Sequence, residues 1–379
     1  MTNYAVVGTG MMGGEHIRNI ALIPGAKVSA IVEPDAEMRE RTIDLCERSF
    51  GAAPTVLDDP ADLAKREDCD AVVVASPNHT HLPVMRKLMQ SYLPVLCEKP
   101  VALDANEAME LLSRARHRRA PVWVAMEYRY MAPVERLIAA VRAKEKGRLG
   151  MVSIREHRFP FLSKVGDWNR FSRNTGGTLV EKCCHFFDLM RLITASEPTR
   201  VYASGSMAMN HLQERYEGET PDIIDNAFVT LDFDSGIRAN LDLCMFAEGA
   251  RWQEIVTATC ENGALAALVP GPGRFEPPGP DGVIHERHAE FRVTDRETKW
   301  EERLPMKLPP EVLAAGDHHG STWVQHRRFN EMLRRHTKPE VTLMDGAIAV
   351  MIGAAAEESA RTGQAIDLRP RLEALTNVA

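Results

Sequence analysis

The most informative stretch of the sequence is Tyr4-Ala5-Val6-Val7-Gly8-Thr9-Gly10-Met11-Met12-Gly13, an apolar run followed by a G-x-G-x-x-G motif. The apolar run predicts a buried strand, and residues 15–22 predict a helix. Gly8 allows the sharp turn between them, Gly10 leaves the backbone open, and Gly13 lets the helix pack closely on the strand. A helix N-terminus in this setting offers free N–H groups and a positive dipole end, so the stretch predicts a pyrophosphate site.

An acidic residue closes the second apolar run, Val28-Ser29-Ala30-Ile31-Val32-Glu33, at the distance from the glycine motif that a dinucleotide-binding unit requires. A carboxylate at this position accepts hydrogen bonds from both ribose hydroxyls and repels a 2′-phosphate. The sequence therefore predicts NAD rather than NADP. The alternative is a solvated strand end that meets no ligand.

Strand-like and helix-like runs alternate through residues 1–125. This alternation predicts βαβ units and a doubly wound parallel sheet, hence a dinucleotide-binding α/β domain over residues 1–125. Strands are predicted at residues 4–7, 27–32, 54–57, 71–75, 94–97 and 122–126, and helices at 36–49, 82–90 and 105–116.

The pattern changes near residue 150, where longer runs alternate apolar and polar residues in the manner of half-buried strands. Residues 126–379 are therefore predicted to form an α+β domain with a largely antiparallel sheet, with its last helices free to pack back on the first domain. Strands are predicted at 151–158, 200–204, 226–232, 237–245, 251–259 and 290–293, helices at 178–194, 322–335 and 344–362, and an irregular Pro- and Gly-rich loop at 270–282.

Composition excludes several classes of protein. The chain has 379 residues, 44% hydrophobic and 26% charged, with a net charge of −7, so it lacks the basic footprint of a nucleic-acid or membrane-surface binder. No apolar run approaches the ~20 residues of a membrane span. The seven cysteines are odd in number and form no C-x-x-C pair, which argues against a disulfide framework or a zinc site. We expect a reduced, cytoplasmic protein.

The segment that follows Gly176-Gly177 places three titratable residues on one face of the predicted helix. Glu181, His185 and Asp188 are spaced i, i+4 and i+7. Two carboxylates beside an imidazole form a proton-transfer set and tune its pKa toward neutrality. Two structural alternatives stay open. Thr178-x-x-Glu181 also fits a capping box, and a histidine on an amphipathic helix more often belongs to the fold.

Four motifs in this order resemble the Gfo/Idh/MocA oxidoreductase family. They are Gly8-x-Gly10-x-x-Gly13, Ser76-Pro77-Asn78-His79-Thr80-His81, Glu98-Lys99-Pro100, and the Gly-Gly segment with His185-x-x-Asp188. The likeness covers nearly the whole chain and includes residues 345–363, which are similar to the helix that closes these proteins. The resemblance implies an N-terminal Rossmann domain, and an α+β domain whose open sheet face forms the contact of a homodimer or homotetramer.

The resemblance also implies site residues. Lys99 resembles the family's active-site lysine, which hydrogen-bonds the reacting hydroxyl or carbonyl, and His185 resembles its general acid/base. Glu181 stands where inositol dehydrogenase-like members usually carry Asp. Cofactor contacts are expected from Gly8, Gly10, Met11, Met12, Gly13, Glu33, Ser76, Asn78, His81, Glu98 and Lys99.

The chemistry of alcohol oxidation agrees with these roles. A proton must leave the O–H group while a hydride leaves carbon. A cationic Lys99 stabilises the developing alkoxide, and His185 accepts the proton. We therefore expect an NAD-dependent dehydrogenase that acts on a sugar, cyclitol or glycoside. A redox-neutral, NAD-using glycosidase and a non-catalytic NAD-binding regulator are the alternatives.

Other residues are candidates for substrate contact. Tyr128 and Arg129 follow the sixth strand, where the domains should meet, with interdomain packing as the alternative. Between residues 155 and 173, an aromatic residue with polar neighbours suits a sugar ring and the arginines suit an acidic substituent, or the segment is a solvated basic face. Asp317-His318-His319 favours a substrate-pocket loop over a metal site. The candidates are Tyr128, Arg129, Trp168, Asn169, Arg170, Asp188 and His318.

Overall fold

The computed structural model describes residues 1–275, 282 and 287–379. Its first domain is built on a six-stranded parallel sheet of order β3-β2-β1-β4-β5-β6, which confirms the predicted doubly wound architecture. All six predicted strands are present within a few residues of their expected bounds. They are β1 (Thr2–Val7), β2 (Ala26–Val32), β3 (Thr55–Leu57), β4 (Ala71–Val74), β5 (Val95–Cys97) and β6 (Val122–Val124).

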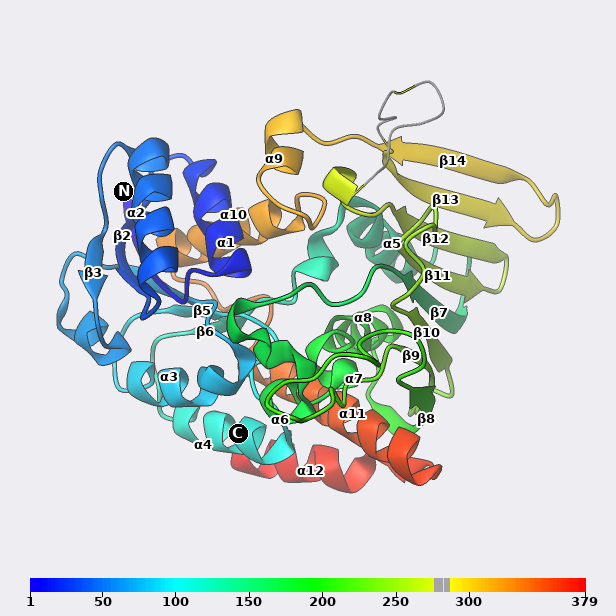
Figure 1. The fold of residues 1–379 in the computed structure, drawn as a ribbon. Helices are drawn as coiled ribbons and strands as arrows, with labels where there is room; N and C mark the ends of the chain where they lie inside the picture. The colour runs from blue at the N-terminus through cyan, green and yellow to red at the C-terminus, as the bar shows by residue number, and fades with distance from the viewer. Residues whose placement is uncertain (276–281, 283–286) are drawn as a thin grey trace.

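Helices cover both faces of this sheet, as Figure 1 shows. The side chains of Asp35 and Asp104 cap two of them, as expected for acidic residues before an amphipathic run. These helices are α1 (Met11–Ala21), α2 (Ala36–Phe50), α3 (His81–Leu88) and α4 (Ala105–Ala115). Short 3-10 turns lie at η1 (Pro60–Lys65), η2 (Asn78–Thr80), η3 (Glu127–Tyr130), η4 (Val165–Arg170) and η5 (Gly273–Phe275). Most of the loop predicted at 270–282 lies outside the described residues.

The second domain contains a nine-stranded mixed sheet of order β14-β13-β12-β11-β7-β10-β9-β8-β15. Only β7 and β10 pair in parallel; the other neighbours are antiparallel, as predicted. The strands are β7 (Leu149–His157), β8 (Pro198–Ser206), β9 (Asn226–Phe233), β10 (Arg238–Cys244), β11 (Glu254–Cys260), β12 (Gly263–Val269), β13 (Ala289–Asp295), β14 (Glu301–Met306) and β15 (Ile366–Asp367).

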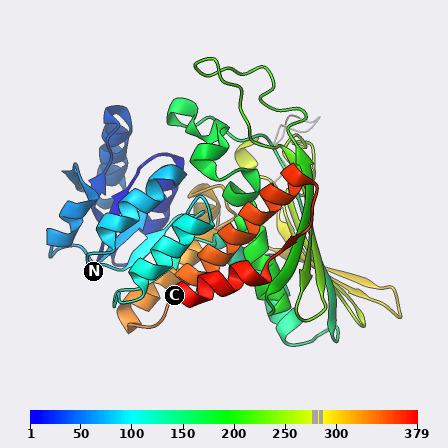
Figure 2. The ribbon, with the colours of Figure 1, turned by 90° about the horizontal axis from the view of Figure 1, so that it is seen from below.

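One face of this sheet is covered and the other is open. Helices α5 (Ala132–Arg142), α8 (Cys184–Thr194) and α11 (Leu343–Thr362) pack against the covered face, and Figure 2 shows α11 lying across it. Burial alternates along β8 and β9, so the open face carries their outward side chains. Of these, Phe228 is 65% exposed and Tyr202 44%, and Met151 of β7 is 55% exposed.

The helix predicted at 178–194 is interrupted, which corrects the sequence analysis. The chain forms α6 (Ser172–Thr175), α7 (Thr178–Glu181) and then α8, with Lys182 and Cys183 between the last two. The capping-box alternative is wrong because Gly177 caps α7, while the Thr178 hydroxyl donates to the Ile224 carbonyl at 2.6 Å. The break means that Glu181, His185 and Asp188 do not share one helical face.

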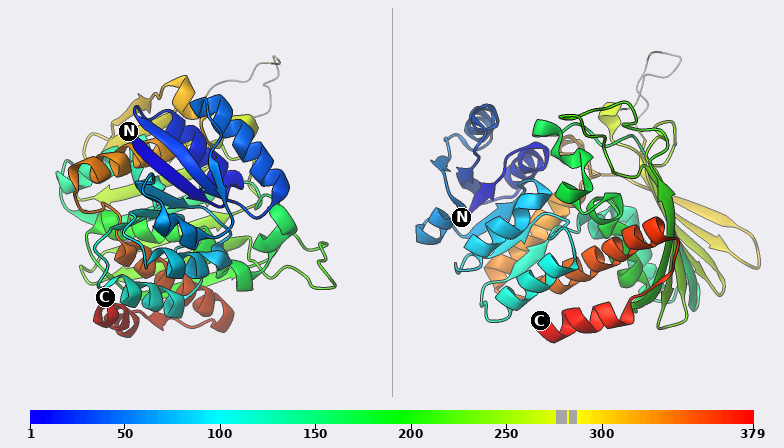
Figure 3. Two further views of the ribbon diagram at one scale, coloured as in Figure 1. Left: turned by 90° about the vertical axis from the view of Figure 1, so that its left-hand side faces the viewer. Right: turned by 60° about the horizontal axis from the view of Figure 1, so that its bottom comes forward.

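The last helices connect the two domains. On α10 (Ser321–Arg335), Phe329 packs against Tyr4 and Trp123 of the first domain. Helices α11 and α12 (Arg369–Val378) pack against α4, as both views in Figure 3 show. The short α9 (Pro310–Ala314) precedes α10. None of the helices in the described part of the chain combines the length and apolar character of a bilayer span.

Candidate functional site

A cavity of about 1160 Å³ lies between the glycine motif and the second domain. It is lined by the start of α1, the end of β5, and residues from η3, α7 and the loop after α9. This arrangement brings together part of the predicted site. The predicted residues on its wall are Gly10, Met11, Met12, Lys99, Tyr128, Glu181, His185 and His318.

The glycine motif has the geometry of a phosphate-binding turn. Gly8 adopts a φ of +82°, and a Cβ at this position would lie 2.4 Å from the Ser76 Cα. A Cβ on Gly13 would lie 2.2 Å from the Gly8 carbonyl oxygen, whereas one on Gly10 would meet nothing within 4 Å. No side chain caps the start of α1. Gly10, Met11 and Met12 line the cavity, and the turn fits the pyrophosphate of a dinucleotide.

Glu33 is buried and lies off the cavity wall, behind the glycine motif. One carboxylate oxygen accepts hydrogen bonds from the Thr9 N–H at 2.7 Å and the Thr9 hydroxyl at 3.1 Å, and the other accepts from the Asp35 N–H at 3.0 Å. Glu33 therefore fixes the turn, and its contact with a ribose stays a prediction.

Further predicted cofactor residues also lie off the wall, namely Gly8, Gly13, Ser76, Asn78, His81 and Glu98. His81 is buried, with Nδ1 2.7 Å from the Pro100 carbonyl and Nε2 2.9 Å from the Ser76 carbonyl. It therefore ties the segment after β4 to the segment after β5. The Asn78 side chain is buried as well.

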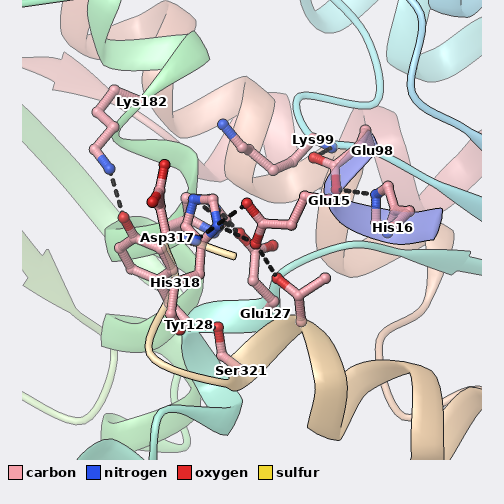
Figure 4. Close-up of polar contacts among 12 residues, drawn as sticks. Glu15, His16, Glu98, Lys99, Glu127, Tyr128, Lys182, Asp317, His318 and Ser321 are labelled. Carbon is pink, nitrogen blue, oxygen red and sulfur yellow. Dashed lines mark hydrogen bonds and ion pairs between the residues drawn. The ribbon is translucent and has the colours of Figure 1, made fainter. Parts of the chain in front are cut away.

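Lys99 points into the site just after β5. In Figure 4 its ammonium group faces the middle of the site, between Lys182 on one side and Glu98 on the other. The Nζ atom donates to the Glu181 carbonyl at 3.2 Å. Burial opposes the charge, but Cys184, Glu98, Glu127 and Glu181 together outweigh it and raise the pKa of Lys99. The lysine is a cation at neutral pH.

A buried chain lies behind Lys99. Glu98 accepts hydrogen bonds from the Lys99 N–H at 3.2 Å and from His16 Nε2 at 2.9 Å. His16 Nδ1 in turn lies 2.8 Å from His326 Nε2 on α10. This chain fixes the backbone that presents Lys99.

His185 lies in a stacked, buried position at the start of α8. Its ring lies 4.1 Å from the Tyr128 ring at an interplanar angle of 5°. Its Nε2 is 3.6 Å from the Glu127 carboxylate, and its Nδ1 has no hydrogen-bond partner among the described residues. Burial, followed by Lys99 and Lys182, lowers the pKa of His185 well below its ordinary value. The imidazole is therefore neutral at neutral pH, which is the form a proton acceptor must have.

The predicted carboxylate partners of His185 are wrong. Asp188 instead forms a 2.5 Å ion pair with Arg129. The carboxylate beside His185 is Glu127, whose own pKa burial raises to about 7. The sequence predicts that carboxylates bring the pKa of His185 toward neutrality. This prediction is wrong, because the pKa of His185 is well below its ordinary value.

Sequence reasoning also missed Lys182 and Glu15. The Lys182 ammonium donates to the Tyr128 hydroxyl at 2.5 Å and pairs with Glu156 at 2.8 Å. Glu15 pairs with His318 Nδ1 at 2.7 Å, and despite burial this contact raises the pKa of His318 to about 9. Position could have indicated Glu127, because residues after a parallel strand collect at the ligand edge of such sheets. The sequence gave no such signal for Lys182, because in the predicted continuous helix its side chain would point away from the face that carries Glu181 and His185.

Comparison with known proteins decides the family. Residues 2–126 match the model described as oxidoreductase family, NAD-binding Rossmann fold, and residues 139–368 match its C-terminal alpha/beta domain. The chain belongs to the Gfo/Idh/MocA oxidoreductase family. Its first domain is thus an NAD-binding Rossmann domain.

Proteins of known name are similar to this chain. The uncharacterized oxidoreductase YrbE of Bacillus subtilis is 26% identical over 365 residues, covering 96% of this chain and 95% of that protein. Inositol 2-dehydrogenase 1 of Paenarthrobacter aurescens is 28% identical, covering 69% and 72%. The structure of a levoglucosan dehydrogenase with NADH and levoglucosan has a TM-score of 0.78 at 18% identity, covering 97% and 99%.

Several candidates from the sequence lie in packing contacts of this Gfo/Idh/MocA structure, away from the cavity wall. Arg129 pairs with Asp188, which agrees with the interdomain-packing alternative. The Trp168 ring lies 5.9 Å from that of His79. Asn169 donates to the Leu162 carbonyl at 3.0 Å. Arg170 pairs with Glu214 at 2.9 Å.

The cysteines and possible metal ligands of this family member are unremarkable. All seven cysteines are free, and six of them are buried. Within the described ranges, no group of three or more His, Cys, Asp or Glu side chains is arranged to hold a metal ion.

Proposed function

We propose that the protein is an NAD-dependent dehydrogenase that interconverts a secondary hydroxyl and a keto group of a sugar, cyclitol or glycoside. The observation that supports this most is the meeting of a cationic Lys99 and a neutral His185 on one cavity wall that also includes the open start of α1. The relatives named as inositol and levoglucosan dehydrogenases agree with a polyol substrate.

The two side chains divide the chemistry. Lys99 holds the reacting oxygen and stabilises the negative charge that develops on it. His185 accepts the hydroxyl proton during oxidation and returns it during reduction. When bound, the nicotinamide ring accepts or donates the hydride.

A screen of cyclitols, monosaccharides and glycosides with NAD tests the proposal. We expect NADH absorbance to rise with at least one polyol. Conversion of a glycoside with no net NADH would instead indicate the redox-neutral cycle. NAD binding with no turnover of any compound would indicate a regulator.

Cofactor choice gives a further test. We expect wild-type enzyme to prefer NAD over NADP, and Glu33→Ala to weaken NAD binding by ~1–3 kcal/mol, the range for a lost hydrogen bond to a charged group. Thr9→Val is the matched control, because it removes one hydroxyl contact with Glu33 and keeps the carboxylate. Titration calorimetry with both cofactors measures the effect. Equal kcat/KM for NAD and NADP in the wild type would contradict the assignment.

We also propose that the open sheet face forms a homodimer or homotetramer. Phe228, Tyr202 and Met151 expose apolar side chains there, and exposed apolar surface is typical of a protein–protein contact. We expect Phe228→Asp to shift the protein to the monomer in light scattering after gel filtration. Trp300→Asp is the control, because this exposed tryptophan lies between β13 and β14. A monomeric wild type would rule the interface out.

A further inference from the structure

A cluster of cations on the cavity wall has no role in the proposed hydride transfer. The chain leaving β7 places Arg158 and Lys164 on the wall, with Lys99 and Glu181 also lining it. Charges of this kind are rarely left without a partner inside a protein. The positive charges of Arg158 and Lys164 therefore indicate that the cavity binds a negatively charged group.

The ion pairs that the described residues form near this cluster do not include Lys164. Glu156 serves both Lys182, at 2.8 Å, and Arg158, at 3.4 Å. The Lys164 side chain has neither an ion-pair nor a hydrogen-bond partner among the described residues. Burial lowers the pKa of Lys164. The positive charges of Lys99 and Arg158 lower this pKa further, and the negative charge of Glu181 opposes them. Within the described ranges, the geometry leaves the Lys164 ammonium without an ion pair on this wall.

Glu181 adds a second unpartnered group. Its side chain is buried, and its Oε2 atom has no hydrogen bond among the described residues. Burial raises the pKa of Glu181, although Lys99, Lys164 and Arg158 all favour its charged form. A buried carboxyl oxygen without a hydrogen bond suits a hydroxyl group of a ligand.

The cluster lies on the substrate side of the cavity. Arg158, Lys164 and Glu181 line the same cavity as Lys99 and His185, the two residues to which the proposed function assigns the reacting hydroxyl. The phosphates of a dinucleotide fit the start of α1, so they do not account for the charge of Lys164.

We propose that the substrate is a polyhydroxy acid whose carboxylate binds between Arg158 and Lys164 while one of its hydroxyls hydrogen-bonds Glu181. This inference rests on the proposed function and names its substrate class. The reaction stays the same: the C–H hydride passes to NAD, the O–H proton passes to His185, and a ketone forms. The carboxylate takes no part in the bond changes and fixes the orientation of the ring.

Matched pairs of sugars test this inference. Glucose with glucuronate, and galactose with galacturonate, differ only in a CH₂OH or carboxylate at C6. Titration calorimetry of the enzyme–NADH complex gives Kd for each compound, and NADH formation with NAD gives kcat/KM. We expect at least one acid to bind about tenfold or more tightly than its neutral partner, and Lys164→Met to weaken that acid about 10- to 100-fold.

Three variants separate a local contact from a general charge effect. Lys164→Arg should retain most of the preference for the acid, and Arg158→Met should reduce it. Lys65→Met makes the same change in net charge at an exposed ion pair with Asp62, and should leave the preference unchanged. NAD affinity should be the same in all of them.

The outcomes distinguish this inference from the proposed function. Neutral sugars that are oxidised and bind as tightly as their acids would overturn the acidic subsite and leave the dehydrogenase standing. Acids that bind tightly through Lys164 without any NADH formation would keep the subsite and overturn the dehydrogenase. Weaker NAD binding in Lys164→Met would assign the lysine to the cofactor and overturn the inference.

Discussion

Lys99→Ala is expected to lower kcat by ~10²–10³-fold, the range observed when one donor to a developing oxyanion is removed. The expectation follows from the position of the ammonium group, which points into the site and, among the described residues, hydrogen-bonds the Glu181 carbonyl alone. Since Lys99 makes no contact with the glycine motif, NAD affinity should change little. Initial rates of NADH formation and calorimetry with NAD measure the two effects on one preparation.

A control keeps the Lys99 experiment interpretable. Lys87→Ala removes a lysine of similar size from a half-exposed ion pair with Asp59, and should keep wild-type kcat. A melting temperature of Lys99→Ala close to that of the wild type excludes misfolding as the cause. Nearly unchanged kcat with hydride transfer rate-limiting would remove Lys99 from the chemistry.

His185→Ala should lower kcat by ~10²–10⁴-fold, the usual contribution of a general acid/base. Its effect should also appear in the pH profile of oxidation. Only neutral imidazole accepts a proton, and burial lowers the pKa of His185 well below 6.5. kcat/KM should therefore be lost as pH falls through a value below 6.5. Near neutral pH the imidazole stays neutral, so its titration should not change kcat/KM there.

Neighbouring groups must be separated from His185 in that profile. Glu127 lies 3.6 Å from its Nε2 and has a pKa of about 7, while His318 nearby has a pKa of about 9. We therefore expect His185→Ala to remove the acidic limb, and Glu127→Gln to move it without abolishing turnover. An acidic limb that persists in His185→Ala would assign it to another group.

The sequence predicts the first domain well because its signals are local. A short apolar run, a glycine turn and a capped helix each require only neighbouring residues, and every predicted strand from β1 to β6 is present. The second sheet is harder to predict. Strand β12 is rich in Ala and Leu without clear alternation, and β14 is an exposed edge with Glu301, Glu302 and Arg303. Neither pattern distinguishes a strand from a loop.

The site shows the same limit. Lys99 follows a buried strand, so its motif places it without knowledge of the other domain. Helix spacing, by contrast, gave His185 the wrong partners, because α7 and α8 are separate helices. Glu127 meets His185 only through tertiary packing, and Lys182 reaches Tyr128 because Glu156 lies on β7 behind it. Such contacts depend on the arrangement of elements far apart in the chain.

The contacts of the last helices affect the order in which this protein becomes stable. The Val124 N–H in β6 donates to the Val341 carbonyl at 3.2 Å, and Leu375 of α12 is 1% exposed in the helical layer that covers α4. During translation the nucleotide-binding half leaves the ribosome long before these residues are made. Its outer strand and fourth helix therefore stay uncovered until residues 341–375 have been made. A truncation ahead of these residues would destabilise a domain that lies more than 200 residues earlier in the chain.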